Sequence, residues 1–331
     1  MLAVRAAEPL REVRAVLNLP PAEASRGLPV VLSGVITYIK PEGRPDLIVQ
    51  DDTAGIFVND LPDNPPPELR PGAFIELRGV TVQGNFGPAL RYQSFTVLGT
   101  RPLPEPTRVS FDDLQSARFH SQYVEVAGVV RSVQIDWQLT PARLLLKVAM
   151  PAGQMDVWVL RFTEDEGLRL VDARVRLRGV CLYWSNTRRQ PISLRILVND
   201  LPSLVVDRPG QLDPFLAPLV PLDALLQYRP DGSDQHRIRI RGVVTLHRPG
   251  EVLILQNGPR GVKIRPAVSA DASVGDEIEA AGFVSRGGYT AELQDTVFRV
   301  LGHPGPPAPQ RLAQSQFAGN LQVPDLDQRL V

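Results

Sequence analysis

A glycine placed seven residues after a turn recurs three times along this 331-residue chain. No other feature restricts the possible folds as strongly. The three pairs are Gly72 with Gly79, Asp172 with Gly179, and Gly275 with Gly282. A fixed offset met three times indicates an internal repeat, and a repeat has to be recognised before any fold is assigned.

A second recurring feature places a glycine before a valine inside an apolar run, at Gly34, Gly128 and Gly242. Two short apolar stretches lie between the two marked glycines of each unit, such as LIVQ and GIFV in the first. One more apolar stretch follows the second glycine, ending in FTVLG, RILVN and FRVLG. Each of the three units is therefore predicted to contain five strands.

The periodicity of the chain supports strands over helices. Arginine alternates with valine, leucine or isoleucine at 174–178 and at 237–241, which is typical of half-buried strands. We interpret these arginine ladders as the solvated side of a sheet rather than as a nucleic-acid surface. The 32 prolines and 26 glycines fit many short strands joined by turns.

Five strands with a glycine inside a long first strand are typical of a small closed barrel, because that strand must bend to pair on both sides. Each unit resembles the OB-fold on the residues PVVLSGVITY, LIVQDDTAGIFV and LRPGAFIELRGVTVQGNFGPAL and their counterparts. Together the units resemble the repeated extracytoplasmic OB-fold region of certain bacterial sensor histidine kinases and diguanylate cyclases. An immunoglobulin-like sandwich is the alternative, but it needs about seven strands per unit and does not explain the paired glycines.

The expected fold class is therefore all-β, with three tandem five-stranded OB-like barrels joined by proline-rich linkers and preceded by short lead-in helices. The barrels are expected at 27–104, 108–206 and 218–302, between a signal stub with a lead-in segment at 1–26 and, at 303–331, a linker with the start of a truncated fourth unit. The linkers are expected to be semi-rigid spacers.

Helix is expected at few places. Ser110 precedes Asp112 and Asp113 as the N-cap of one lead-in helix, and PLDALLQY has helical spacing. The OB-fold usually has a helix between its third and fourth strands. Five prolines forbid it in NDLPDNPPPELRPG, whereas FTEDEGLRLVD has room for one turn, although its acidic run is expected to be solvated loop.

No catalytic motif occurs, so we expect no enzyme activity, no cofactor and no metal in this region. The histidines, His120, His236, His247 and His303, form no metal-binding pattern and are interpreted as surface or turn residues. Asp51 and Asp52 allow a metal or a hairpin turn, and we favour the turn. The single cysteine, Cys181, is expected to be a buried apolar residue.

Aromatic residues in the loop before each last strand are the candidate binding site. They are Phe86 in the first unit, Tyr183 and Trp184 with Arg188 and Arg189 in the second, and Tyr289 in the third. Such a ring beside glycines is a stacking platform for a ligand, or a plug that closes the barrel or packs on its neighbour. The plug is the favoured interpretation of the recurring position.

Two functional classes follow. The resemblance implies a non-catalytic, periplasmic sensing or interaction region of a membrane-anchored signalling protein that binds a small molecule or a periplasmic protein and is able to form a homodimer. The alternative is a single-stranded nucleic-acid binder, which needs basic and aromatic surface. Because 36 basic residues balance 36 acidic ones and aromatics make up 6%, no nucleic-acid partner is expected.

Overall fold

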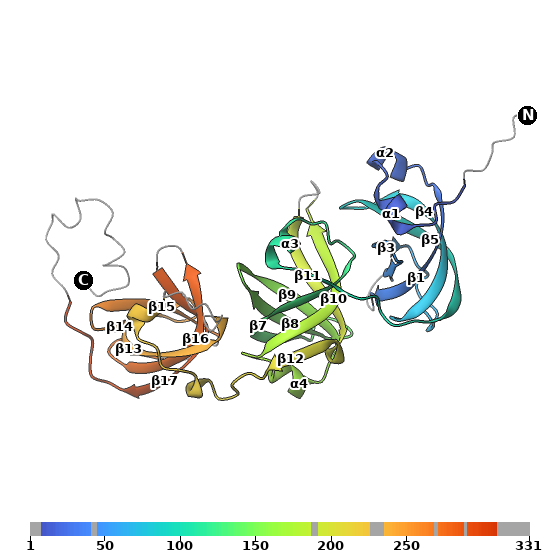
Figure 1. Cartoon of the computed structure of the whole chain (residues 1–331). Helices are drawn as coiled ribbons and strands as arrows, with labels where there is room; N and C mark the ends of the chain where they lie inside the picture. Colours follow the sequence, from blue (N-terminus) through green and yellow to red (C-terminus); the bar gives the residue numbers. More distant parts are fainter. Residues whose placement is uncertain are drawn as a thin grey trace, which may run out of the picture. The chain divides into compact units, whose positions relative to one another are not determined.

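The computed structural model describes residues 8–40, 45–186, 191–225, 235–267, 271–287 and 290–309. The chain divides into two compact units between Arg208 and Pro209, and the first unit contains two barrels while the second contains one (Figure 1). No helix in the described part of the chain is long and apolar enough to cross a membrane.

The first barrel closes from five strands in the order β1-β2-β3-β5-β4. The strands are β1 (Pro29–Ile39), β2 (Leu47–Gln50), β3 (Gly55–Asn59), β4 (Ala73–Gln83) and β5 (Pro88–Thr100). Two short helices precede them, α1 (Val13–Leu17) and α2 (Pro21–Ala24). Val13 and Val16 of α1 are fully buried in the core of this barrel, so the lead-in segment packs as part of it.

The second barrel repeats the same order, β7-β8-β9-β11-β10, and closes through β10 and β7. Its strands are β7 (Tyr123–Asp136), β8 (Arg143–Met150), β9 (Gly153–Arg161), β10 (Arg174–Ser185) and β11 (Pro191–Asp200). The additional elements are β6 (Thr107–Arg108), α3 (Phe111–Gln115), α4 (Glu164–Leu168), η1 (Leu201–Ser203) and β12 (Leu204–Arg208).

Two local predictions for this barrel can be compared with the structure. Ser110 caps α3 as expected, since its hydroxyl accepts from the Asp113 amide while the Asp113 carboxylate accepts from the Ser110 amide. The acidic run expected as loop instead forms the first turn of α4, where carboxylates are stabilised by the positive end of the helix dipole. The proline-rich connector of the first barrel forms no helix, as expected.

The third barrel has the order β13-β14-β15-β17-β16. Its strands are β13 (Arg237–Arg248), β14 (Val252–Asn257), β15 (Arg260–Pro266), β16 (Glu277–Gly287) and β17 (Thr290–Gly302), preceded by the 3₁₀ turns η2 (Pro214–Leu216) and η3 (Leu222–Ala224). Three closed barrels with the same strand order confirm the all-β OB-like fold. They exclude the immunoglobulin-like sandwich considered from the sequence.

The first marked glycine of each unit lies where the first strand changes partner. Strand β1 pairs with β4 up to Val35 and with β2 from Val35 onward, so Gly34 is adjacent to the change. A β-carbon on Gly34 would lie 2.7 Å from the Gln50 carbonyl oxygen, and one on Gly128 would lie 2.4 Å from that of Ala149. Close approach between backbones, rather than an unusual dihedral angle, therefore requires these glycines.

The seven-residue spacing also has a structural cause. Each span begins in the left-handed region, with φ of +88° at Gly72, +68° at Asp172 and +97° at Gly275. Each of these amides donates to a carbonyl of the first strand, at Ile36, Val130 and Val244. The span then ends at a glycine whose added β-carbon would meet the last strand at 2.5 Å in all three barrels.

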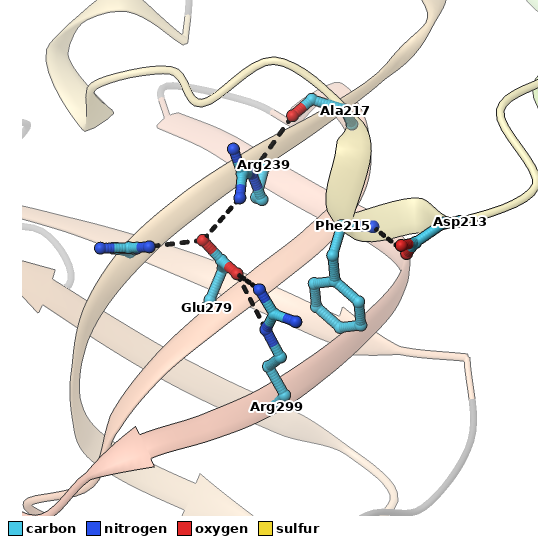
Figure 2. A network of polar contacts seen from close by, with 7 residues as sticks. Asp213, Phe215, Ala217, Arg239, Glu279 and Arg299 are labelled. Carbon is cyan, nitrogen blue, oxygen red and sulfur yellow. Dashed lines mark hydrogen bonds and ion pairs between the residues drawn. The ribbon is translucent and has the colours of Figure 1, made fainter.

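A buried carboxylate joins β13, β16 and β17 in the third barrel (Figure 2). Glu279 is 0% exposed, and its Oε1 accepts from Arg239 Nη1 at 3.0 Å and from Arg241 Nε at 3.0 Å. Its Oε2 accepts from Arg299 Nε at 2.9 Å. The ladder at 237–241 is thus partly exposed, as expected of a sheet's outer side, but two of its arginines hold a buried anion.

The same network attaches the lead-in turn η2 to the barrel. Arg239 Nε donates to the Ala217 carbonyl at 3.2 Å, and the Arg299 guanidinium lies 4.4 Å from the Phe215 ring centroid (Figure 2). Asp213 caps η2 by accepting from the Phe215 amide at 2.9 Å. One carboxylate therefore organises three strands and the segment that leads into them.

Candidate functional site

The two barrels of the first unit are joined by specific hydrogen bonds. The Gln122 side chain pairs with the backbone of Gly55, donating to its carbonyl at 3.0 Å and accepting from its amide at 3.0 Å. Asn199 Nδ2 donates to the Thr37 carbonyl at 2.9 Å. A β-carbon at position 55 would lie 2.0 Å from the Ser121 carbonyl oxygen, so the contact admits only glycine there.

Apolar side chains complete this contact. Tyr38 and Ile48 of the first barrel pack with Leu182 and Leu197 of the second in one buried cluster. The proline-rich segment 100–107, expected to act as a spacer, therefore connects two barrels that touch each other. The first unit offers a site to which both barrels contribute.

A cavity of about 650 Å³ lies at this contact, and we call it the inter-barrel cavity. The first barrel lines it with β3, with Lys40 and Asp46 at the two ends of the β1–β2 connection, and with the β4–β5 loop at 83–88. Strand 3 and these two loops are the surface with which OB-folds bind oligonucleotides and oligosaccharides. The second barrel forms the opposite wall.

Phe86 and Tyr183, both singled out from the sequence, meet at this cavity from different barrels. Their ring centroids are 6.0 Å apart, and the His120 ring lies 5.0 Å from Phe86 and 6.2 Å from Tyr183. Phe86 is half-buried and packs against the core of the second barrel. The Tyr183 hydroxyl donates to the Leu114 carbonyl. Phe86 thus makes the packing contact that the sequence allowed, while both rings also line the cavity.

Trp184 takes part in a second aromatic group with Trp158 and Arg195. The Arg195 guanidinium lies 4.0 Å from the Trp158 ring centroid and 4.5 Å from that of Trp184. Burial lowers the pKa of Arg195, which nevertheless stays charged at neutral pH. Trp158 was not predicted as a site residue. Its position in the third strand of the second unit could have indicated it, because that strand belongs to the ligand surface of OB-folds. Arg188, Arg189 and Tyr289 lie outside the described residues.

Positive charge exceeds negative charge around the inter-barrel cavity. Among the described lining residues, Arg14, Lys40 and Arg118 are cationic and Asp46 is anionic. Lys40 Nζ lies 3.9 Å from Asp46, and Arg118 also pairs with Asp113. The balanced charge of the whole chain therefore does not describe this surface.

His120 is held neutral at the cavity wall. Its Nδ1 accepts from the Tyr183 amide at 3.3 Å, which a protonated ring nitrogen is unable to do. Burial lowers the pKa of His120 to about 4. The interpretation as a turn histidine is confirmed, but the ring is packed between aromatic residues instead of lying free at the surface.

We expect the stability of the first unit to fall as the pH is lowered from about 6.5 towards 4. In that window the unfolded chain protonates His120 at its ordinary pKa of about 6.5, whereas the folded chain does not, so acid favours unfolding. Urea denaturation of His120→Asn, which keeps an acceptor near the Nδ1 position, should show a smaller decrease between pH 7 and pH 5. An equal decrease in both proteins would contradict this assignment.

The remaining candidate groups have structural roles. Asp51 accepts from the Val13 amide at 2.8 Å and from the Ala54 amide at 2.9 Å, so it fixes its turn and the start of α1. No cluster of three metal-ligating side chains occurs in the described ranges. Cys181 is fully buried, which raises its thiol pKa to about 12 and confirms the expected apolar role.

Comparison with known proteins gives likenesses of fold. No protein-family model matches the sequence, and no curated protein matches it either. A chain from the structure of a Replication Protein A heterotrimer bound to ssDNA is similar over 86% of this chain and 95% of its own length, at 8% identity and a TM-score of 0.27. A murine DNA-binding protein bound to ds DNA matches 53% and 96% at 14% identity and a TM-score of 0.28. Asparaginyl-tRNA synthetase from Pyrococcus horikoshii matches 43% and 54% at 12% identity and a TM-score of 0.24.

These comparisons correct one expectation. Two of these matching structures contain ds DNA or ssDNA, which contradicts the prediction that no nucleic-acid partner is expected. It depended on net charge and aromatic content averaged over the whole chain, and neither average describes a local surface such as the inter-barrel cavity. The resemblance holds at the level of OB-like barrels, and nothing supports the narrower likeness to kinase or cyclase sensor regions.

Proposed function

We propose that the first unit binds single-stranded nucleic acid at the inter-barrel cavity. The observation that carries the proposal is the composition of this cavity. The surface of the first barrel that corresponds to the ligand-binding surface of OB-folds faces the second barrel, and aromatic side chains of both barrels lie between them. Phe57, Phe86, Trp158 and Trp184 line the cavity. Aromatic rings beside a cationic rim suit a single strand, because every base has a face that stacks and every phosphate is an anion.

The cationic residues that line the cavity supply the electrostatic contribution to the binding of a single strand. Arg14, Lys40 and Arg118 allow about three phosphate contacts, which predicts a modest affinity with a modest dependence on salt. Periplasmic location, membrane anchoring and the absence of catalysis remain predictions. The sensing role implied by the family resemblance has no residue in the described structure that favours it.

We expect log Kd for a labelled ten-nucleotide strand to rise with log salt with a slope of about 2, since each contact with a single strand contributes about 0.7. Affinity should then fall roughly twentyfold between 50 and 200 mM salt. Lys40→Gln should reduce the slope by about 0.7, as measured by fluorescence anisotropy of the full chain.

Arg26→Gln provides the matched control, because Arg26 is exposed and does not line the cavity. Its slope should equal that of the native chain. Absence of binding at 50 mM salt, or binding that does not respond to salt, would refute the proposed function. Equal slopes in the native chain and Lys40→Gln would place binding at another surface.

A further inference from the structure

Three buried polar atoms at the inter-barrel cavity have no hydrogen-bond partner within the described structure: Asn59 Oδ1, Gln83 Oε1 and Ser121 Oγ. All three residues line the cavity. Nearly all buried polar groups in proteins are paired, and each unpaired one has a cost of desolvation. Three such atoms around one cavity indicate that a ligand supplies the missing partners.

The orientation of these groups is fixed by their other contacts. Gln83 Nε2 donates to the Gly84 carbonyl at 3.0 Å, which identifies Oε1 as the free acceptor. Ser121 is 2% exposed, its amide donates to the Cys181 carbonyl at 2.8 Å, and its φ is +63°. A residue other than glycine in this conformation is strained, and such strain is retained where the surroundings hold it.

We propose that the inter-barrel cavity takes one unstacked nucleobase and reads its edge with Asn59, Gln83 and Ser121. This inference depends on the proposed function and adds a preference among bases. A cavity of about 650 Å³ falls in the range of sites for small ligands, so it holds a nucleotide and not a length of strand. The rest of the strand would lie along the cationic rim.

The chemistry of the three groups selects the base. Asn59 and Gln83 offer acceptors, and Ser121 offers an oxygen that both donates and accepts. Adenine, cytosine and guanine each carry an amino group with two donors, whereas thymine has one N–H between two carbonyl groups. Amino-bearing bases are therefore expected to satisfy this site better than thymine or uracil.

The test compares strands that differ at one position. Binding of the full chain to labelled dT10 is measured against the same strand with one central dC or dA. The native chain should bind the substituted strands at least about fivefold more tightly than dT10. Ser121→Ala and Asn59→Leu should abolish this difference, so that each variant binds all three strands with about the same affinity.

The controls separate recognition from structure. Ser94→Ala, at an exposed serine that does not line the cavity, should keep the base preference. Ser121→Ala should not lower Tm, because the hydroxyl that it removes has no partner in the described structure. A lowered Tm, a native chain without base preference, or a preference that survives both variants would refute the base-reading proposal alone. Failure of every strand to bind would refute the proposed function as well.

Discussion

Gly128→Ala is expected to destabilise the second barrel by at least about 3 kcal/mol, although it adds a single methyl group. The new β-carbon would lie 2.4 Å from the Ala149 carbonyl oxygen and 2.6 Å from Val148 Cγ1. A side chain is able to rotate away, but the carbonyl belongs to the β7–β8 pairing. Relief therefore requires the two strands to separate.

Tryptophan fluorescence measures this effect in the second barrel. The three tryptophans of the chain, Trp137, Trp158 and Trp184, all lie in the second barrel. Denaturant unfolding followed by their emission should show a much lower midpoint for Gly128→Ala. Gly302→Ala is the control, because no atom lies within 4 Å of the added β-carbon; it lies in the third barrel, which has no tryptophan, so its unchanged stability is measured by calorimetry. A native-like midpoint for Gly128→Ala would contradict the steric explanation of the repeat.

Glu279→Gln is expected to cost the third barrel about 2–4 kcal/mol. The substitution preserves the shape of the side chain but leaves Arg239, Arg241 and Arg299 close together without their anion. Because the arginines are 22–51% exposed, water compensates part of this loss, which places the cost below that of a fully buried ion pair.

The pH dependence of the third barrel should follow the same carboxylate. Burial alone would raise the pKa of Glu279, but hydrogen bonds from Arg241 and Arg299 outweigh it, and the pKa lies below its ordinary value. A depressed folded pKa contributes stability that is present above pH 4.5 and is lost as the pH falls through the folded pKa. Glu279→Gln should lose this part of the acid sensitivity.

Calorimetry of the full chain measures the change, and tryptophan emission serves as an internal reference because the third barrel contains no tryptophan. Glu76→Gln is the matched control. Glu76 occupies the same position, three residues before the marked glycine, but its pair with Arg78 is exposed and should contribute less than about 1 kcal/mol. Similar losses in the two variants would show that burial of Glu279 is unimportant.

The fold was predictable because its determinants are local. Where another backbone strand approaches closely, only glycine fits, and this requirement is visible at a single position of the sequence. Gly34, Gly128 and Gly242 recur for that reason. The partner change of the first strand and the left-handed turn at Gly72 are consequences of the same geometry. Five strands in each unit then leave few ways to close a barrel.

The candidate site was predictable only in part, since it depends on packing between barrels. The sequence marks Phe86 and Tyr183 separately, but nothing in it shows that their rings meet 6.0 Å apart. Asn59 and Ser121 were missed because an unsatisfied atom is recognisable only when its surroundings are known. The arginine ladder at 237–241 was interpreted as solvated because its partner, Glu279, lies on a strand that is far away in the sequence.

The turn that begins each seven-residue span has a consequence for protein engineering. Because the Gly72 and Asp172 amides are tied to the first strand, the start of the strand that follows them is fixed by this turn. The first barrel has a proline-rich loop in that place and the second has the single helical turn α4. In the first barrel Leu61 and Leu69 of this connector belong to the core, so the exposed residues 62–64 are the position where a reporter domain or an affinity epitope is best inserted.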